Sequence, residues 1–358
     1  MAGACNRCLA RTWLLSRLAG HIDRVRGQVE RVLELDDEKL LSAMGGRERE
    51  HVGRQLEALD LDAVRSRSDA AGLETMCACD PMYPLALRRL TAPPAVLHVA
   101  GGLNRLLEFV AGELVAIVGS RRASPYGLDV SRSLGRGLAV TGITVVSGMA
   151  AGVDSAAHAG ALEAGGPTIA VLPGPAHRPY PAGKRALHRR IVAGGLAVSE
   201  LGPGTSVRRW MFLARNRIIA ALAAMTVVVE AREHSGSLVT ARVAQELWRP
   251  VGAVPGRVTT PQAAGSNALL ATGACLVRGT QDVLDHLYGA GVRQAVERRA
   301  EPAPELRPLL AAIAEGHDTT AALARAGFSP DQGLAALAAL ELHGFVRRSH
   351  GGRFSVVP

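Results

Sequence analysis

Two loops of small and polar residues carry the groups best suited to hold an anion. Residues 119–122 (Gly-Ser-Arg-Arg) and 147–152 (Ser-Gly-Met-Ala-Ala-Gly) each follow a short apolar run, at 114–118 and 143–146. Pro125 is well placed for the first turn of a helix after the first loop. Because free backbone N–H groups and the positive end of a helix dipole both favour negative charge, such loops are typical of phosphate sites.

The glycine pattern does not fit the common nucleotide motifs. A dinucleotide fingerprint requires G-x-G-x-x-G after the first strand and an acidic residue at the end of the second. Here Gly119 is followed by Ser-Arg-Arg, and the second run ends in Ser147 and Gly148. The only lysines are Lys39 and Lys184, and neither lies in a P-loop motif. The sequence therefore indicates neither dinucleotide binding nor nucleotide hydrolysis.

A second group of basic residues precedes a strongly apolar segment. Arg215 and Arg217 flank Asn216, and Arg208 and Arg209 lie just before them. Arginines at a helix start can bind phosphates in a bidentate manner, while the asparagine caps the helix or contacts a base edge. The alternative is a solvated helix face.

Two further polar segments have the composition of helix starts. Ser235, Gly236 and Ser237, together with Thr240, offer hydroxyl groups, and Asn267 ends a Gly-Ser-Asn segment. Helix capping is the default interpretation for each segment taken alone. Both follow apolar runs, so both are candidates for the same anion site.

Several residues have the types found in catalytic sites. Asp154, Ser155 and His158 lie close in sequence, but no geometry activates the serine, so we expect a packing role and an N-cap at Asp154. Glu200 and Glu230 each end an apolar run. They could form an acid/base pair or anchor loops by accepting backbone N–H groups.

The cysteines fall into two close pairs and one single residue. Cys5 and Cys8 have the spacing of a zinc knuckle, and Cys77 and Cys79 form a tighter pair almost seventy residues later. Four thiolates suffice for a structural zinc ion, and reduced thiols are an equal alternative. Cys275 lies in a strand-like run and is expected in the core.

These groups need a scaffold that brings strand ends together. Seven short apolar runs alternate with helical segments, and an edge strand is expected before them. The pattern predicts an α/β fold with a doubly wound, mainly parallel sheet, in which ligands bind at the carboxyl edge. The strands are expected at residues 95–99, 114–118, 143–146, 168–172, 196–199, 224–229, 251–254 and 274–277.

Composition divides the chain into three domains and a linker. Residues 1–80 are predicted to form a charged helical domain, with one helix across 22–35, and residues 81–288 hold the sheet. Residues 289–304 are rich in glycine, proline and charge and are predicted to be a linker. Residues 305–358 have the pattern of three short helices and a hairpin, which predicts a winged helix.

The third helix of this last domain would be the DNA-recognition helix of a winged helix, but its side chains suit base reading poorly. It carries no arginine between Arg325 and Arg347. Since base reading in the major groove relies on such side chains, a protein-contact or packing module is the preferred interpretation.

Charge and hydropathy limit the class of partner. The formal net charge of +9 favours a polyanion such as nucleic acid. The aromatic content of 3% leaves few aromatic side chains on which the bases of a single strand could stack. No apolar N-terminal stretch follows a basic start, and the uncharged run at residues 218–229 is too short to cross a bilayer. We therefore expect a cytoplasmic protein with no membrane contact.

The order of these motifs resembles the DNA-processing protein A family (DprA, also called Smf). The matching motifs are Gly119-Ser120-Arg121, residues 147–154 with His158, Tyr180-Pro181, Ser199-Glu200, Arg215-Asn216-Arg217, Ser235-Gly236-Ser237, Pro255-Gly256 and Gly265-Ser266-Asn267. The resemblance covers roughly residues 83–288. Leu213, Lys184 and Trp248 depart from the family pattern.

The resemblance implies an extended Rossmann-like fold, optional terminal domains of which the first is SAM-like or helix-hairpin-helix-like, and no catalysis or required cofactor. It implies a homodimer that binds single-stranded DNA, protects incoming DNA and loads the RecA recombinase during natural transformation. The DNA or phosphate site would comprise Gly119, Ser120, Arg121, Arg122, Gly148, Arg208, Arg209, Arg215, Asn216, Arg217, Ser235, Gly236, Ser237 and Asn267. The four cysteines are not part of the family pattern.

Two other functions stay open at this point. One is an enzyme of the nucleotide-monophosphate glycosidase type on a related sheet, with Glu200 or Glu230 as the acid, although the motif P-G-G-x-G-T-x-x-E lacks its glutamate here. The other is a regulatory protein that binds a small phosphate metabolite.

Overall fold

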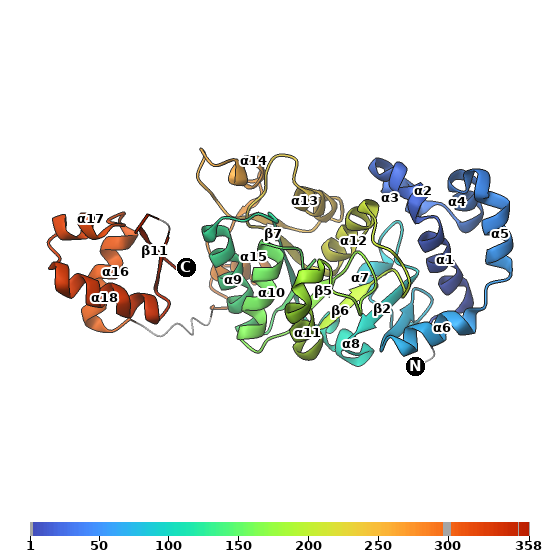
Figure 1. The fold of residues 1–358 in the computed structure, drawn as a ribbon, viewed down its shortest axis with the longest axis horizontal. Coiled ribbons are helices and arrows are strands. Elements are labelled where there is room, and N and C mark those ends of the chain that lie inside the picture. Colours follow the sequence, from blue (N-terminus) through green and yellow to red (C-terminus); the bar gives the residue numbers. More distant parts are fainter. Residues whose placement is uncertain (1–2, 296–301, 350, 358) are drawn as a thin grey trace. The chain divides into compact units, whose positions relative to one another are not determined.

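A single large sheet forms the centre of the protein. In the computed structural model, which describes residues 3–295, 302–349 and 351–357, nine of the described strands join in the order β1-β2-β6-β5-β4-β3-β7-β8-β9 (Figure 1). The strands are β1 (Glu74–Cys77), β2 (Val96–Ala100), β3 (Leu114–Val118), β4 (Thr144–Ser147), β5 (Thr168–Val171), β6 (Leu196–Ser199), β7 (Met225–Val228), β8 (Val251–Ala253) and β9 (Cys275–Leu276).

The strand order reverses at the middle of the sheet. From β3 the chain adds β4, β5 and β6 on one side, and then returns to pair β7 with the other side of β3. Strands β3 to β9 are parallel, whereas β2 is antiparallel to β1 and β6. The predicted α/β, mainly parallel sheet is confirmed. Its reversal point between β3 and β7 is where doubly wound sheets bind ligands.

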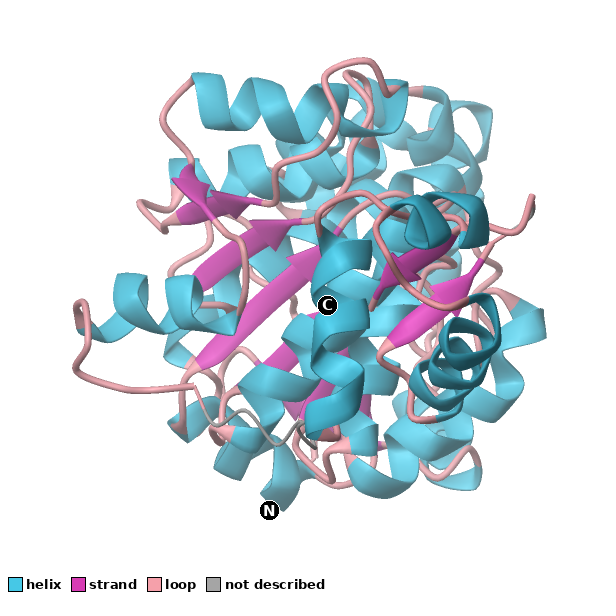
Figure 2. Cartoon of the chain, turned by 90° about the vertical axis from the view of Figure 1, so that its left-hand side faces the viewer, coloured by secondary structure: helices cyan, strands magenta, loops and turns pink. Residues whose placement is uncertain are grey.

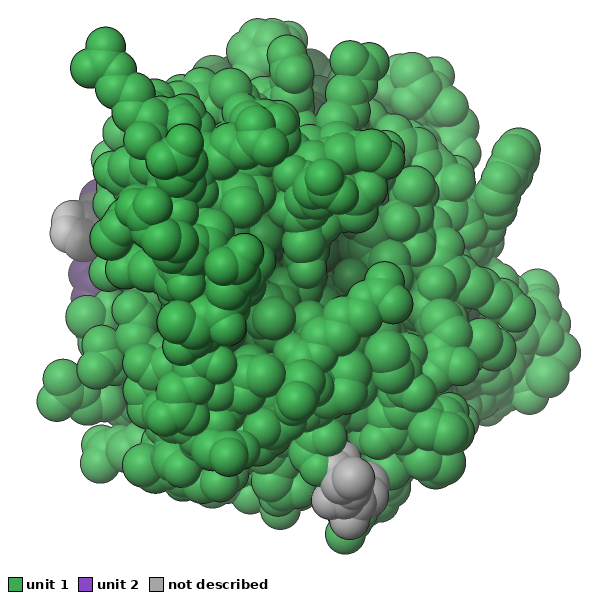
Figure 3. All heavy atoms as spheres, turned by 90° about the vertical axis from the view of Figure 1, so that its right-hand side faces the viewer, with its two compact units in different colours: residues 1–296 green, residues 297–358 purple. Residues whose placement is uncertain are grey.

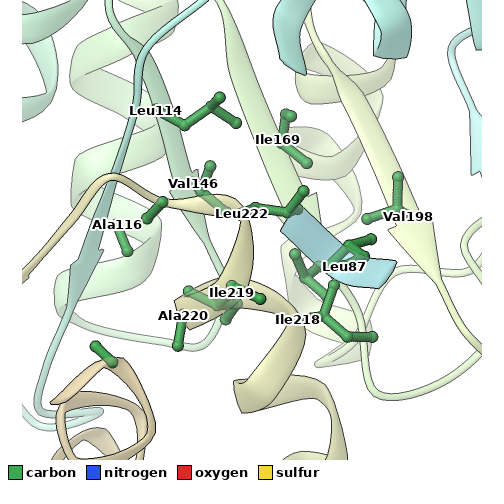
Figure 4. Close-up of a cluster of buried hydrophobic side chains, with 14 of the residues drawn as sticks. Leu87, Leu114, Ala116, Val146, Ile169, Val198, Ile218, Ile219, Ala220 and Leu222 are labelled. Carbon is green, nitrogen blue, oxygen red and sulfur yellow. The ribbon is translucent and has the colours of Figure 1, made fainter. Parts of the chain in front are cut away.

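Helices cover both faces of the sheet (Figure 2). Because side chains alternate along a strand, Val115 and Ile117 pack against α9, α10 and α15, whereas Leu114 and Ala116 pack against α8, α12 and α13. Figure 4 shows the second layer, where Ile219 and its neighbours on α12 meet the strands. The helices are α7 (Leu85–Arg88), α8 (Leu103–Ala111), α9 (Pro125–Val140), α10 (Val153–Glu163), α11 (Arg185–Gly194), α12 (Arg209–Leu222), α13 (Gly236–Glu246), α14 (Ala264–Ala271) and α15 (Thr280–Tyr288).

Helix α12 is buried over most of its length, and the buried part includes Arg215, Asn216 and Arg217. The prediction that these residues start a helix is wrong. The helix begins at Arg209, so they lie in its middle. Polar groups inside a buried helix need partners or a ligand, because leaving them unpaired in the core is costly.

The N-terminal helices pack against the sheet part of the chain. Residues 1–296 form one compact unit, which Figure 3 views from the side of α4 and α5, where its surface is hollowed. Leu14, Ile22 and Leu40 share a core with Trp210 of α12, whose ring nitrogen donates to Ala19 O (3.1 Å). These helices are α1 (Asn6–Arg17), α2 (Ala19–Arg24), α3 (Val29–Glu34), α4 (Asp37–Met44), α5 (Arg49–Glu57) and α6 (Leu61–Ala70).

The first eighty residues differ from the prediction in two places. The helix expected across 22–35 is divided by a 3-10 turn, and residues 74–77 form β1 at the edge of the sheet. Short apolar runs cannot be assigned to strand or helix by periodicity alone. The five 3-10 helices in the described residues are η1 (Arg26–Gln28), η2 (Gly46–Glu48), η3 (Ala182–Lys184), η4 (Pro261–Ala263) and η5 (Pro304–Leu306).

Residues 297–358 form a second compact unit. Its described elements have the predicted order of three helices and a hairpin, around a core that includes Leu309, Leu340 and Phe345. They are α16 (Arg307–Ala314), α17 (Thr320–Arg325), α18 (Pro330–Leu342), β10 (Val346–Arg348) and β11 (Phe354–Val356). The winged-helix assignment stays a prediction. Part of the predicted linker, residues 296–301, lies outside the described residues.

None of the helices in the described part of the chain is both long enough and apolar enough to cross a membrane.

Candidate functional site

A cavity of about 380 Å³ opens where the strand order reverses, at the carboxyl ends of β3, β4 and β7. Helix α12 forms one of its walls. The cavity is lined by Val118, Gly119, Ser120, Arg121, Arg122, Ala150, Asp154, Phe212, Leu213, Arg215, Asn216, Arg232, His234, Ser235, Gly236, Ser237 and Thr240. The structure thus brings the two predicted anion loops together.

Backbone hydrogen bonds join the loops around Ser120. Its N–H donates to Glu230 O (2.7 Å), and its carbonyl accepts from Val153 N (3.2 Å). Gly152 has φ +82°, and a Cβ atom there would lie 2.1 Å from Ser120 O. Only glycine allows this conformation and this approach without strain. The floor of the cavity is therefore fixed by main-chain geometry.

Arg215 lies in the cavity wall with hydrogen-bonding capacity to spare. The residue is 7% exposed, and its Nη2 lies 3.7 Å from Asp154 Oδ2. Among the described residues, neither Nε nor Nη1 has a hydrogen-bond partner. Burial lowers the pKa of Arg215, and the charge of Asp154 opposes that shift. The guanidinium stays charged in proteins and has two buried donors without a partner among the described residues, so its charge favours an anion in the adjoining cavity.

Gly148 makes the position of Arg215 possible. A Cβ atom on Gly148 would lie 1.3 Å from Arg215 Nη1, so a larger residue would displace the guanidinium. Gly148 N and Ala150 N both donate to Asp154 Oδ2, at 3.2 and 3.3 Å. The predicted N-cap role of Asp154 is corrected: Gly152 is the N-cap of α10, and Asp154 lies inside the helix and holds the preceding loop.

The carboxyl group of Asp154 is also buried. Burial raises its pKa, whereas Arg215 and the two N–H donors favour the ionised form and oppose the shift. The lining of the cavity still carries a net positive charge, because it contains four arginines and only this one carboxylate.

Exposed basic residues and an aromatic pair lie beside the buried arginine. Arg121, Arg122 and Arg232 are exposed cavity-lining residues from the loops after β3 and β7. The Arg121 guanidinium lies 4.8 Å from the ring centre of Phe212, and the Tyr180 ring packs edge-on against Phe212 at 5.2 Å. A cationic surface next to aromatic rings can bind phosphate and base together.

The Ser-Gly-Ser segment forms a helix start, as predicted. Ser235 is the N-cap of α13, and its side chain accepts from Ser237 N (3.3 Å). Asn216 Nδ2 donates to Gly236 O (3.2 Å), which ties α12 to this loop. Asn216 therefore links two walls of the cavity and uses one N–H of its side-chain amide to do so.

Arg217 does not reach the cavity, contrary to the prediction. Its Nη1 and Nη2 donate to the two carboxylate oxygens of Glu200, at 2.9 and 2.7 Å, and its Nε donates to Ala92 O (3.0 Å). The side chains of Arg217 and Glu200 are each 8% exposed. The cause is helical geometry, since residues two apart on a helix face different directions.

Four other predicted site residues lie outside the cavity lining, and one of them is Gly148, which packs against Arg215. Arg208 and Arg209 are exposed at the start of α12. The predicted capping role of the Gly-Ser-Asn segment is also corrected, because Asn267 lies within α14 and brackets the backbone of Gly256 with two hydrogen bonds of 3.0 Å.

The groups that suggested catalysis each have separate structural partners. Ser155 Oγ donates to Ala150 O (2.6 Å), and His158 Nδ1 lies 2.7 Å from Thr168 Oγ1. Burial lowers the pKa of His158 to about 3. Glu230 accepts from Ser124 N (2.8 Å) at the start of α9 and so anchors a loop. With Glu200 bound to Arg217, the proposed acid/base pair is not assembled.

Sequence reasoning missed Phe212, Leu213, Arg232, His234 and Ala150 among the lining residues. The position of Arg232 and His234 just after a predicted strand was a usable signal, because such loops gather at the carboxyl edge. Phe212 had no comparable signal, since an aromatic residue in an apolar segment is ordinarily part of the core.

Comparison with known proteins places this chain in a known family. The family described as DNA recombination-mediator protein A matches residues 74–288. The putative DNA processing protein DprA of Mycobacterium tuberculosis is 44% identical over 198 residues, which are 55% of this chain and 50% of the relative. The chain thus spans about half the length of that relative. DprA of Bacillus subtilis is 35% identical over 216 residues, covering 60% of this chain and 72% of the relative.

Solved structures agree with these sequence matches. DNA processing protein A of Streptococcus pneumoniae superposes with a TM-score of 0.64 at 31% identity, over 79% of this chain and 98% of that one. The Helicobacter pylori protein, whose structure is described as revealing a single-stranded DNA binding mode, gives 0.54 at 31% identity, over 61% and 97%. The chain therefore belongs to the DNA recombination-mediator protein A family.

Proposed function

We propose that this protein binds single-stranded DNA in the cavity at the reversal point of the sheet and acts as a recombination mediator rather than as an enzyme. The observation that carries the proposal is Arg215, a buried cation with two N–H donors that lack partners among the described residues. A backbone phosphate supplies a charge and acceptor oxygens to match them.

A strand is a better ligand for this surface than a small phosphate compound. The exposed arginines Arg121, Arg122 and Arg232 come from two different loops, so the positive surface extends beyond the pocket around Arg215. Several separate cations suit successive phosphates of one chain, and each phosphate contact releases counterions.

The ring pair of Tyr180 and Phe212 supports single-stranded rather than duplex DNA. Tyr180 is 38% exposed, and the pair adjoins Arg121. Bases are available for stacking on such rings only where the strand is unpaired. Stacking of this kind tolerates every base, so we expect little sequence preference.

The relatives extend the proposal to partners. The matched family is described as a recombination mediator, and the Helicobacter pylori protein is described as binding single-stranded DNA. We propose that this chain protects incoming DNA, forms a homodimer and loads the RecA recombinase onto the strand. These roles belong to the whole protein and are what the resemblance of its motifs to the family implies.

The DNA site is tested with the double variant Arg121→Ala/Arg232→Ala in a fluorescence-anisotropy titration with a labelled oligothymidine. Losing two phosphate contacts should weaken binding about 10- to 100-fold. The slope of log affinity against log salt should fall in size by about 1.4, at about 0.7 per contact on a single strand.

The matched control is Arg47→Ala/Arg54→Ala, which removes the same charge from exposed residues that do not line the cavity. If both double variants bind alike, the cavity is not the DNA site. A mononucleotide that competes as well as the oligomer, at equal phosphate concentration, would instead indicate a small-metabolite site.

The mediator role is tested by adding the protein to RecA and single-stranded DNA covered with single-strand-binding protein. Loading predicts faster onset of RecA ATP hydrolysis, and the Arg121→Ala/Arg232→Ala variant should lose this effect. An onset that the wild-type protein does not change would contradict the mediator role while leaving DNA binding intact.

A further inference from the structure

We propose that Cys5, Cys8, Cys77 and Cys79 form a structural zinc site that joins the N-terminal helices to the edge of the sheet. The four sulfur atoms lie within 4.8 Å of one another. They come from two segments about seventy residues apart, and Cys8 and Cys79 are separated by 71 positions. The inference is independent of the proposed DNA binding.

The distances suit one tetrahedral ion. Zinc–thiolate bonds of about 2.3 Å in a tetrahedron place the sulfur atoms about 3.8 Å apart. The Sγ atoms of Cys8 and Cys79 are 3.7 Å apart. That separation is far longer than a disulfide bond of about 2.05 Å. Iron–sulfur clusters spread their four thiolates over two or more irons, whereas the four sulfurs here all lie within 4.8 Å of one another, as the ligands of a single ion do.

The surroundings also favour a metal site. Cys5 N lies 3.5 Å from Cys77 Sγ and donates to it, a contact that supports the thiolate form and orients the ligand. Cys8 and Cys77 are buried among apolar residues that include Leu9 and Val96, whereas Cys79 is exposed. The ion would thus be shielded on one side and reachable on the other.

The position of the cluster explains what the ion would do. Cys5 is the N-cap residue of α1, and Cys77 is the last residue of the edge strand β1. A four-thiolate ion would fasten the start of the N-terminal helices to the sheet and close a long loop of chain. Soft thiolate ligands select zinc over the hard cations magnesium and calcium.

The test is elemental analysis of the full chain, purified under reducing conditions. We expect about one zinc per chain in the wild type and a loss of at least tenfold in Cys8→Ser/Cys79→Ser. Cys275→Ser is the matched control, since Cys275 lies on β9 outside the cluster, and it should keep its zinc. Replacement by Co²⁺ should give the visible absorption bands of a tetrahedral thiolate site.

A measurement on the wild type covers the possibility that the double serine variant fails to fold. Titration with an organomercurial should release one zinc as four thiols react, and Cys275→Ser should release the same amount. A folded wild-type chain without zinc, zinc retained in the double variant, iron in place of zinc, or a disulfide among the four cysteines in the freshly reduced protein would each overturn the proposal.

Discussion

Arg215 and Arg217 are two positions apart on α12 and have opposite roles. Arg215 keeps two N–H donors without partners among the described residues and lines the cavity, whereas Arg217 is bound to both oxygens of Glu200. The same residue type therefore lines the cavity at one position and stabilises the fold at the other. The two arginines differ in how many of their donors the neighbouring carboxylate occupies: Glu200 accepts from both Nη atoms of Arg217, whereas Asp154 lies 3.7 Å from one Nη atom of Arg215.

The buried pair yields a prediction about stability. Replacing Arg217 by Met leaves the Glu200 carboxylate buried without its partner, which should lower the free energy of unfolding by about 3–5 kcal/mol. Urea denaturation measures the loss. The double variant Glu200→Gln/Arg217→Met should recover part of it, because the uncompensated charge is gone. A single variant as stable as the wild type would contradict the assigned pair.

At the level of elements, the site depends on close approaches between loops and helices. The loop after β3 is bonded to the loops after β4 and β7 through Ser120. Glycines at 148 and 152 let the second loop approach Arg215 and Ser120. Helix α12 then brings Arg215 and Phe212 to the same cavity. A change in any of these contacts should alter binding without a change in the charge of the protein.

Gly148→Ala tests this dependence. The added methyl group would displace the Arg215 guanidinium, so we expect at least a tenfold loss of affinity for single-stranded DNA. Gly183→Ala is the control, because a Cβ at Gly183 meets no atom within 4 Å. Thermal melting establishes that both variants are folded. Full affinity in folded Gly148→Ala would show that Arg215 does not contact the strand.

At the scale of the whole molecule, the core contains histidines that must stay neutral. Burial lowers the pKa of His98 to about 4 and that of His158 to about 3. Among the described residues, neither ring nitrogen of His98 has a partner, and the ring faces a second cavity of about 230 Å³ next to α1 and α6. Both imidazoles gain a proton more readily in the unfolded chain, whose histidines have pKa values near 6.5.

This difference predicts the pH dependence of stability. The unfolded state binds more protons below pH 6.5, so the contribution of these histidines to stability is present at pH 7 and is lost as the pH falls toward 4. Between pH 7 and pH 5 the expected loss is about 2 kcal/mol for each histidine. Urea denaturation at the two pH values should show that the free energy of unfolding falls less in His98→Asn than in the wild type. An equal slope in that variant would contradict the assignment.

Local sequence patterns determined the strands, the loops after them and the start of α13. Apolar runs bounded by small residues identify buried parallel strands, and a serine before a helix identifies its cap, because both signals lie within a few residues. The anion loops at 119–122 and 147–152 could be recognised for the same reason. Residues 74–77 were missed because a four-residue run next to helices carries too little periodicity.

Only the tertiary structure decided which polar residues meet. Arg215 faces the cavity and Arg217 faces Glu200 because of how α12 is rotated against the sheet, and the pairing of Tyr180 with Phe212 joins residues far apart in the chain. The convergence of the four cysteines likewise needs β1 to lie beside the start of α1. Such contacts depend on packing between distant segments, so the spacing of the cysteines could suggest a four-thiolate site but could not show that the two pairs meet.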